Sequence, residues 1–210
     1  VDAETGDMTL SLADADGDTH SVTIEDHQTD GLDSIRVDHG TGLETEDNNL
    51  DVYTVAPGME AENDDNNLII GTSTSDNIVG RSGDDLIMGA SGDDALDAGA
   101  GDDYVRGDSG NDQLFGSAGD DVLIGGIGSD TLMGGTGSDV IDGGDGADVS
   151  SFSGNQGDYT FASSADGLTV TVTDRSTGDA DTVTNVETLS FDDGDIGVSH
   201  DGTGLVLTGQ

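Results

Sequence analysis

Aliphatic residues recur at every ninth position between residues 71 and 151, and this is the most regular pattern in the chain. Cut every nine residues without an insertion, the stretch gives nine units whose eighth position is aliphatic in all but the last. Because alternate side chains of a strand point to opposite faces, positions 7 to 9 predict a strand of about three residues with its middle side chain inward. The predicted core residues are Ile78, Ile87, Leu96, Val105, Leu114, Leu123, Leu132 and Ile141.

The first six positions of each unit predict a glycine-rich turn that ends in a carboxylate. Glycine adopts positive φ without steric cost and lets a ligand approach the backbone. Position 4 is glycine in eight units, at Gly83, Gly92, Gly101, Gly110, Gly119, Gly128, Gly137 and Gly146. Position 6 is aspartate in all nine, at Asp76, Asp85, Asp94, Asp103, Asp112, Asp121, Asp130, Asp139 and Asp148.

A nine-residue unit cannot bury its apolar side alone, so the units must stack, with two units forming one coil. Units on the same side are then 18 residues apart, and their aspartates face each other in seven pairs: Asp76/Asp94, Asp85/Asp103, Asp94/Asp112, Asp103/Asp121, Asp112/Asp130, Asp121/Asp139 and Asp130/Asp148. Residues 62–70 continue the register backwards as an incomplete unit, with Asn67 in place of the aspartate. We expect this unit to cap the array, and the pair Asn67/Asp85 to form an eighth, weaker site because an amide brings no charge.

Both flanks of the array alternate polar and apolar residues at period two, which is typical of strands. Residues 8–12 and 21–24 predict a hairpin with a long acidic loop, and residues 32–37 and 50–55 predict two more strands. The acidic loop imitates part of an EF-hand, but Thr19 stands where that loop requires glycine, so a hairpin turn is the favoured interpretation. After the array, residues 159–161, 168–173, 182–184, 186–191 and 204–208 predict further strands.

The expected fold class is therefore all-β, since no segment has a helical period. We expect three parts: an N-terminal β segment at 1–60, the stacked array with its capping half-repeat at 61–151, and a β-rich C-terminal flanking segment at 152–210. Because the sequence begins at Val1 and has no recognisable signal peptide, we expect a processed product or a piece of a longer protein.

The charge identifies a cation as the natural partner. Forty-six acidic residues face four arginines and no lysine, for a formal net charge of -42, which excludes a nucleic-acid backbone as a partner. With 31% hydrophobic and 3% aromatic residues, the chain buries too little apolar surface to offset ordering entropy and self-repulsion, so it should be disordered alone. No apolar run is long enough to span a membrane.

Calcium is the cation that suits these turns. It accepts six to eight hard oxygens, including carboxylates and backbone carbonyls, in irregular geometry, whereas magnesium demands a strict octahedron. The chain has no cysteine and only four scattered histidines, which argues against zinc and against a disulfide framework. The sequence therefore predicts about seven complete calcium sites, with Asn67/Asp85 as the weaker eighth.

The nine units resemble the GGxGxDxUx nonapeptides of RTX (repeats-in-toxin) proteins, over 81 of 210 residues. The resemblance implies a right-handed parallel β-roll flanked by short antiparallel segments. It also implies that calcium is held by the position-6 aspartates together with carbonyl oxygens at positions 2 and 4. It further implies an extracellular bacterial protein that leaves the cell through the type I secretion machinery and folds outside, where calcium is abundant.

Two functional hypotheses remain from the sequence. The first is a non-catalytic module that folds when it binds calcium, and the alternative is a calcium-dependent module that binds a polysaccharide or a cell surface, as in an adhesin or a polysaccharide-modifying enzyme. The stretch Gly107-Asp108-Ser109-Gly110 imitates a serine-protease motif, but the nine-residue register explains all four residues. No histidine lies in a suitable context for a catalytic triad, so we do not expect an enzyme.

Overall fold

The computed structural model describes residues 66–164 and 168–200, together with strands at 8–13, 19–25, 34–38, 51–54 and 205–209. The chain divides into two compact units, residues 1–47 and 48–210. The second unit therefore holds the repeats and the described C-terminal strands together. The boundaries expected near residues 60 and 151 stay predictions.

The first unit contains an antiparallel sheet with the order β1-β2-β3. Strand β1 (Met8–Ala13) pairs with β2 (Thr19–Glu25), which confirms the predicted hairpin, and β2 pairs with β3 (Ser34–Asp38). The acidic loop that imitates an EF-hand lies outside the described residues.

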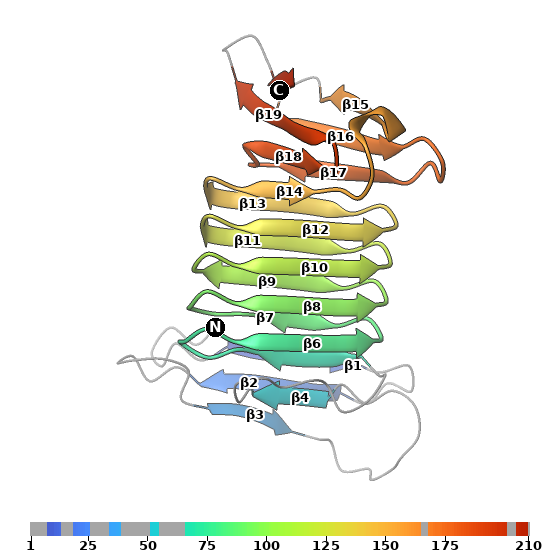
Figure 1. Ribbon diagram of the computed structural model, residues 1–210. Helices are drawn as coiled ribbons and strands as arrows, with labels where there is room; N and C mark the ends of the chain where they lie inside the picture. The colour runs from blue at the N-terminus through green and yellow to red at the C-terminus, as the bar shows by residue number, and fades with distance from the viewer. Residues whose placement is uncertain are drawn as a thin grey trace. The chain divides into compact units, whose positions relative to one another are not determined.

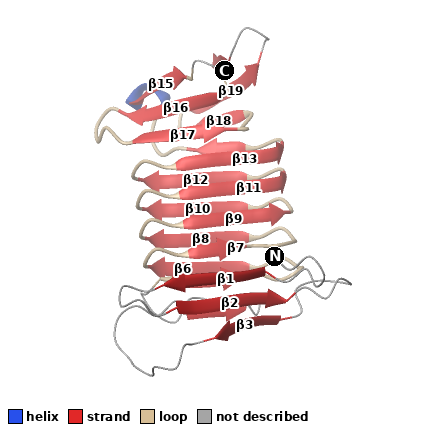
Figure 2. Ribbon diagram, turned by 180° about the vertical axis from the view of Figure 1, so that it is seen from behind, coloured by secondary structure: helices blue, strands red, loops and turns tan. Residues whose placement is uncertain are grey.

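The second unit contains two sheets, and between residues 67 and 151 the chain crosses from one sheet to the other at every turn (Figure 1). Seen from behind, the same strands lie one above another in regular layers (Figure 2). The first sheet consists of β6 (Asn77–Ser82), β8 (Ala95–Ala100), β10 (Gln113–Ala118), β12 (Thr131–Thr136), β14 (Val149–Ser151), β18 (Thr188–Phe191), β19 (Gly194–His200) and β20 (Leu205–Gly209). The second consists of β4 (Asp51–Thr54), β5 (Asn67–Ile70), β7 (Leu86–Met88), β9 (Tyr104–Ser109), β11 (Val122–Gly128), β13 (Val140–Gly146), β17 (Ala180–Thr184), β16 (Thr169–Asp174) and β15 (Tyr159–Ser163).

Strands of the array pair in parallel with partners 18 residues away, as the two-units-per-coil arrangement predicts. Leu114 of β10, for example, lies between Leu96 of β8 and Leu132 of β12. The parallel β-roll and the all-β fold class are thus confirmed. In the described part of the chain, the only helix is a 3₁₀ turn, η1 (Gln156–Asp158).

Most array strands are longer than the three residues expected. They run from position 7 through position 3 of the next unit, and their pairing skips position 1, as at Gly116. Position 2 has positive φ even where it is not glycine, as at Arg81 (84°) and Asp108 (71°). The chain thus bends at the first two positions and resumes pairing, because buried backbone groups need hydrogen-bond partners. The turn itself is reduced to positions 4 to 6.

The core of the roll is a double column of the position-8 side chains, and all eight are fully buried. At the C-terminal end Ser150 replaces the aliphatic residue, and it is also buried. Aromatic rings continue the core beyond it, since Phe152 stacks on Phe191 with ring centroids 5.3 Å apart and Tyr159 lies against both. The array therefore ends in a packed aromatic cluster.

The C-terminal segment was expected to flank the roll with antiparallel strands, but two of its strands continue the parallel sheets of the roll. Strand β17 pairs in parallel with β13, and β18 pairs in parallel with β14, so both extend the coil. The hairpin of β15 and β16 and the strands β19 and β20 then add antiparallel strands at this end of the two sheets. Strand β19 was not predicted, because its Gly- and Asp-rich start reads as a turn.

Candidate metal sites

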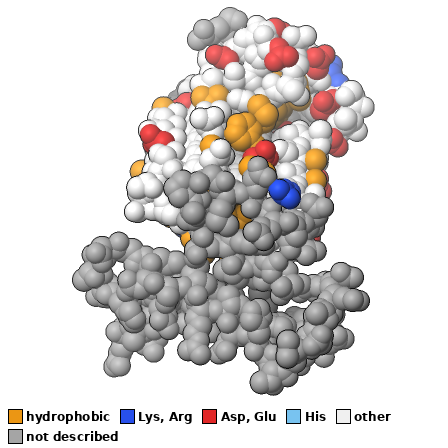
Figure 3. Space-filling view, turned by 60° about the horizontal axis from the view of Figure 1, so that its bottom comes forward, with side chains coloured by type: hydrophobic (Ala, Val, Ile, Leu, Met, Phe, Trp, Pro, Cys, Tyr) orange, Lys and Arg blue, Asp and Glu red, His pale blue; other side chains and the backbone are white. Residues whose placement is uncertain are grey.

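The nine position-6 aspartates lie inside the roll. Each is 1–4% exposed, and Asn67 is fully buried in the equivalent place. On the described part of the face drawn in Figure 3, acidic side chains lie at several separate places among hydrophobic side chains and white atoms of other side chains or backbone. Nine buried carboxyl groups are costly unless they are paired or bind a cation.

One oxygen of most of these carboxyl groups is used to join successive coils. The backbone N–H of each of the first seven aspartates, Asp76 to Asp130, donates to Oδ1 of the aspartate 18 residues later, at 2.7–2.9 Å. Asn67 begins the series by donating its N–H to Asp85 Oδ1 at 2.7 Å. The carboxyl groups therefore form two continuous ladders, one on each side of the roll, in the pairs that the 18-residue spacing predicts.

Each of the nine aspartates has one buried carboxylate oxygen without a hydrogen-bond partner, which is Oδ1 in Asp76 and Oδ2 in the other eight. The eight unpartnered Oδ2 atoms belong to Asp85, Asp94, Asp103, Asp112, Asp121, Asp130, Asp139 and Asp148. Asp76 differs, because its Oδ2 accepts the Thr72 N–H at 2.6 Å and the Thr72 hydroxyl at 2.9 Å. The first of the seven predicted pairs is therefore built differently from the other six.

Except at Asp103, whose unit begins with Ala98, each unpartnered Oδ2 lies against the glycine at position 1 of its own unit. A Cβ added to Gly89 would collide with Asp94 Oδ2 and would also meet the carbonyl oxygen of Gly107 at 2.9 Å. The same pair of neighbours, a carboxylate oxygen and a position-1 carbonyl from the next coil, surrounds Gly80, Gly107, Gly116 and Gly125. The absence of a side chain at position 1 thus leaves oxygen atoms from two coils close together.

Position-1 carbonyls are candidate ligands that sequence reasoning missed, although the glycine at this position in eight units was a usable signal. The predicted position-4 glycines lie in the turns, where a Cβ at Gly110 would overlap the Gly92 carbonyl and approach Asp112 Oδ1. The position-4 carbonyls therefore stack between coils beside the Oδ1 ladder.

The donor set suits calcium. Among the described residues, no group of three or more His, Cys, Asp or Glu side chains is placed to hold a metal ion. Each candidate site instead offers two carboxyl groups from successive coils and nearby backbone carbonyls. An all-oxygen set with few charges and several carbonyls is typical of calcium, and it contains nothing that zinc prefers.

Burial raises the pKa of eight of these carboxyl groups above the usual 3.8, because desolvation penalises the charged form. The ladder N–H opposes the rise, and the neighbouring carboxylates add to it. The pKa reaches about 7 for Asp94, Asp103 and Asp139. The pKa is also raised for Asp85, Asp112, Asp121, Asp130 and Asp148.

We expect the metal-free roll to be more stable at pH 5.5 than at pH 7.5. With pKa values near 7 in the fold and near 3.8 in the unfolded chain, the fold binds more protons between these values, so its stability falls as pH rises through that window. Dialysed, metal-free protein should therefore have a stronger far-UV β signal at pH 5.5. Protons compete with calcium for these carboxyl groups, so calcium should bind the folded roll more weakly at pH 5.5. A stronger metal-free β signal at pH 7.5 would contradict the assignment.

Two carboxyl groups outside the repeats continue the ladders, and the sequence analysis missed both. Asp139 donates its N–H to Asp181 Oδ1 at 2.9 Å, and Asp148 donates its N–H to Glu187 Oε2 at 2.8 Å. The intervals are 42 and 39 residues rather than 18, so a search at fixed spacing cannot find them. The only available signal was the alternation of residues 182–191, which predicts strands but not their parallel pairing with the roll.

A stacked parallel roll with a buried aspartate in every turn defines the class of calcium-binding β-roll repeats. The family described as the RTX calcium-binding nonapeptide repeat (four copies) matches residues 63–96, 88–123, 97–132 and 124–158. Residues 63–158 of this chain are therefore RTX calcium-binding repeats, and the resemblance seen in the sequence is confirmed.

Comparison with solved structures finds the extracellular lipase LipA from Serratia marcescens, at 19% sequence identity and a TM-score of 0.34. The match covers 68% of this chain and 19% of the lipase chain, so this chain spans only a small part of that protein's length. No curated protein matches the chain. Within the described residues, no helix is long and apolar enough to cross a membrane.

Proposed function

We propose that this chain is a calcium-dependent folding module of a secreted bacterial protein and that it carries no catalytic role of its own. The family match gives calcium as the ligand. The proposal adds that the roll is disordered without calcium and folds after export by type I secretion. Extracellular calcium modules bind at roughly 10⁻⁴ to 10⁻³ M, far above cytosolic calcium, so binding energy would become folding energy only outside the cell.

The observation that carries this proposal is the set of nine buried aspartate oxygens without a hydrogen-bond partner, one in each unit of the array. Leaving a charged oxygen buried and unsatisfied costs more than an ordinary lost hydrogen bond. The position-8 columns supply only one aliphatic side chain per nine residues. A cation between the coils would satisfy both carboxylates and relieve their mutual repulsion.

Six array pairs share the complete arrangement, with the unpartnered Oδ2 on the first aspartate and the ladder Oδ1 on the second. They are Asp85/Asp103, Asp94/Asp112, Asp103/Asp121, Asp112/Asp130, Asp121/Asp139 and Asp130/Asp148. We assign weaker binding to Asp76/Asp94, where Thr72 occupies the Oδ2, and to Asn67/Asp85, where an amide replaces a carboxylate.

Calcium titration followed by far-UV circular dichroism at pH 7.5 tests the proposal. Metal-free protein should show little β signal and gain it cooperatively with a midpoint of roughly 10⁻⁴ to 10⁻³ M calcium. Magnesium at the same concentration is the control and should restore much less, because it keeps its water ligands. A full β signal in the metal-free protein at this pH would refute calcium-dependent folding.

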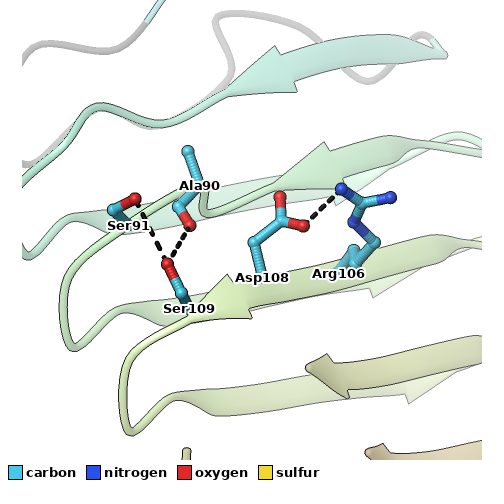
Figure 4. A network of polar contacts seen from close by, with 5 residues as sticks. All are labelled: Ala90, Ser91, Arg106, Asp108 and Ser109. Carbon is cyan, nitrogen blue, oxygen red and sulfur yellow. Dashed lines mark hydrogen bonds and ion pairs between the residues drawn. The ribbon is translucent and has the colours of Figure 1, made fainter. Parts of the chain in front are cut away.

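A second candidate function, calcium-dependent binding of a neutral saccharide, has one observation in its favour. A groove of about 450 Å³ runs along the outside of β9, β11 and β13, with Ile124 and Ile127 beside Arg106, Asp108, Asp145 and Asn185. The groove thus combines two aliphatic side chains with four polar or charged ones, and apolar surface beside convergent polar groups is typical of small-ligand sites. In Figure 4, Arg106 forms an ion pair with Asp108, while Ser109 donates to Ser91 and to the Ala90 carbonyl of the previous coil on that side.

A glycan array probed with and without calcium distinguishes the two candidates. The folding-module proposal expects no specific sugar signal in either condition. Saccharide binding that requires calcium and is lost in Arg106→Ala would favour the second candidate.

A further inference from the structure

We infer that the C-terminal strands complete two additional calcium sites that lie outside the nonapeptide repeats, at Asp139/Asp181 and at Asp148/Asn185/Glu187. This inference rests on the proposed calcium-dependent function and extends it to residues 181–187. The repeats alone leave Asp139 and Asp148 as the last members of their columns. Each has a buried Oδ2 without a partner, like the carboxyl groups inside the array.

The environment of Asp148 reproduces an array site with residues from another part of the chain. Inside the array, Asp130 Oδ2 lies over Gly125 beside the Gly143 carbonyl, and the Asp130 N–H donates to Asp148 Oδ1. One coil further, Asp148 Oδ2 lies over Gly143 beside the Asn185 carbonyl. Its N–H donates to Glu187 Oε2 at 2.8 Å. Asn185 and Glu187 thus take the places of positions 1 and 6 of a missing unit.

The change from aspartate to glutamate fits a shorter turn. Successive position-6 residues of the array are nine apart, whereas Asp181 and Glu187 are 187 − 181 = 6 apart, so the turn before β18 has lost three residues. Glutamate is one methylene longer, and its carboxylate reaches the ladder position from that shortened turn. Asn185 supports this path with a positive φ of 49°, a conformation that asparagine tolerates better than most residues.

Asp181 occupies the next place in the other column. It is 8% exposed, and its Oδ1 accepts the Asp139 N–H at 2.9 Å, as in the array. The interval of 42 residues exceeds the regular 18 by 24, which is the length taken up mainly by η1 and the hairpin of β15 and β16. Strand β17 then resumes the parallel register beside β13, with Val140 paired to Thr182. The insertion leaves the column of carboxyl groups unbroken.

These two sites would couple calcium binding to the C-terminal strands. The aromatic cluster of Phe152, Tyr159 and Phe191 lies between the last repeat and these strands. With calcium bound at Asp139/Asp181 and at Asp148/Asn185/Glu187, the C-terminal strands would order together with the roll. If calcium bound only within the repeats, it would not contact residues 180–191. Any ordering of the C-terminal strands would then be an indirect effect of calcium.

Equilibrium dialysis tests the inference by counting the calcium ions bound per chain. It is carried out on the full chain, at calcium concentrations at which the chain is folded. Compared with the wild type, we expect Asp181→Asn and Glu187→Gln each to bind one ion fewer and the double variant two fewer. Asp179→Asn is the matched control, because it removes the same charge two residues from Asp181 and should leave the stoichiometry unchanged. In hydrogen exchange, calcium should slow the exchange of residues 180–191 in the wild type and in Asp179→Asn but not in the double variant.

The outcomes separate this inference from the proposed function. If the wild type binds no calcium, the proposed function fails. If wild type and folded double variant bind the same number of ions, the two additional sites do not exist, although the array sites stand. If the double variant does not fold, the two single variants decide, and wild-type stoichiometry in both would overturn the inference.

Discussion

Leu114→Ala should lower the free energy of unfolding in excess calcium by about 2–5 kcal/mol. Leu114 is fully buried at position 8, between Leu96 and Leu132 of the neighbouring coils. The column has one side chain per coil on each side, so no neighbour can move sideways to fill the cavity. Urea unfolding at fixed calcium concentration, monitored by circular dichroism, measures the loss.

Gln113→Ala is the control for this experiment. Gln113 precedes Leu114 in β10 and is exposed on the outer face, where a substitution typically changes stability by less than about 0.5 kcal/mol. Similar losses in the two variants would show that the inward column does not hold the coils together.

The nine-residue register was enough to predict most of the roll. Aliphatic residues at position 8 can be buried together only if units two apart lie side by side, and that requirement fixes the pairing of Leu96, Leu114 and Leu132. The same register places the aspartates in columns, so the ladder partners followed from spacing alone. The sequence predicted the roll because only one stacking of the nine-residue units buries every position-8 side chain.

The ends of the roll could not be predicted in this way. Asp181 and Glu187 return to the columns only after an inserted hairpin and through a shortened turn, so no fixed interval identifies them. Likewise, hydrogen bonds from Thr72 to Asp76 depend on how the first turn folds back and not on the repeat letters. The closing aromatic cluster joins Phe152 to Phe191, which are 39 residues apart in an aperiodic segment.

The extent of the strands was also misjudged, for a reason that concerns the backbone. The sequence pattern predicts that the first six positions of each unit form one continuous turn. Pairing resumes at position 2 because residues such as Arg81 and Asp108 adopt positive φ there and keep their backbone groups in the ladder. The demand for backbone hydrogen-bond partners therefore limits the bend to the first two positions and returns the chain to the ladder.

Gly110→Ala should lower the free energy of unfolding in calcium by at least about 2 kcal/mol and raise the calcium midpoint of folding. Gly110 has a φ of 145°, and a Cβ there would overlap the carbonyl group of Gly92, which cannot move without displacing the coil beneath it. Two controls separate the effect of positive φ from the effect of the collision. Gly178→Ala places a Cβ at a positive φ (88°) with no atom within 4 Å, and Gly157→Ala places one in open space without a positive φ. If Gly178→Ala costs as much as Gly110→Ala in urea unfolding, close stacking of the position-4 carbonyls is not what requires glycine in these turns.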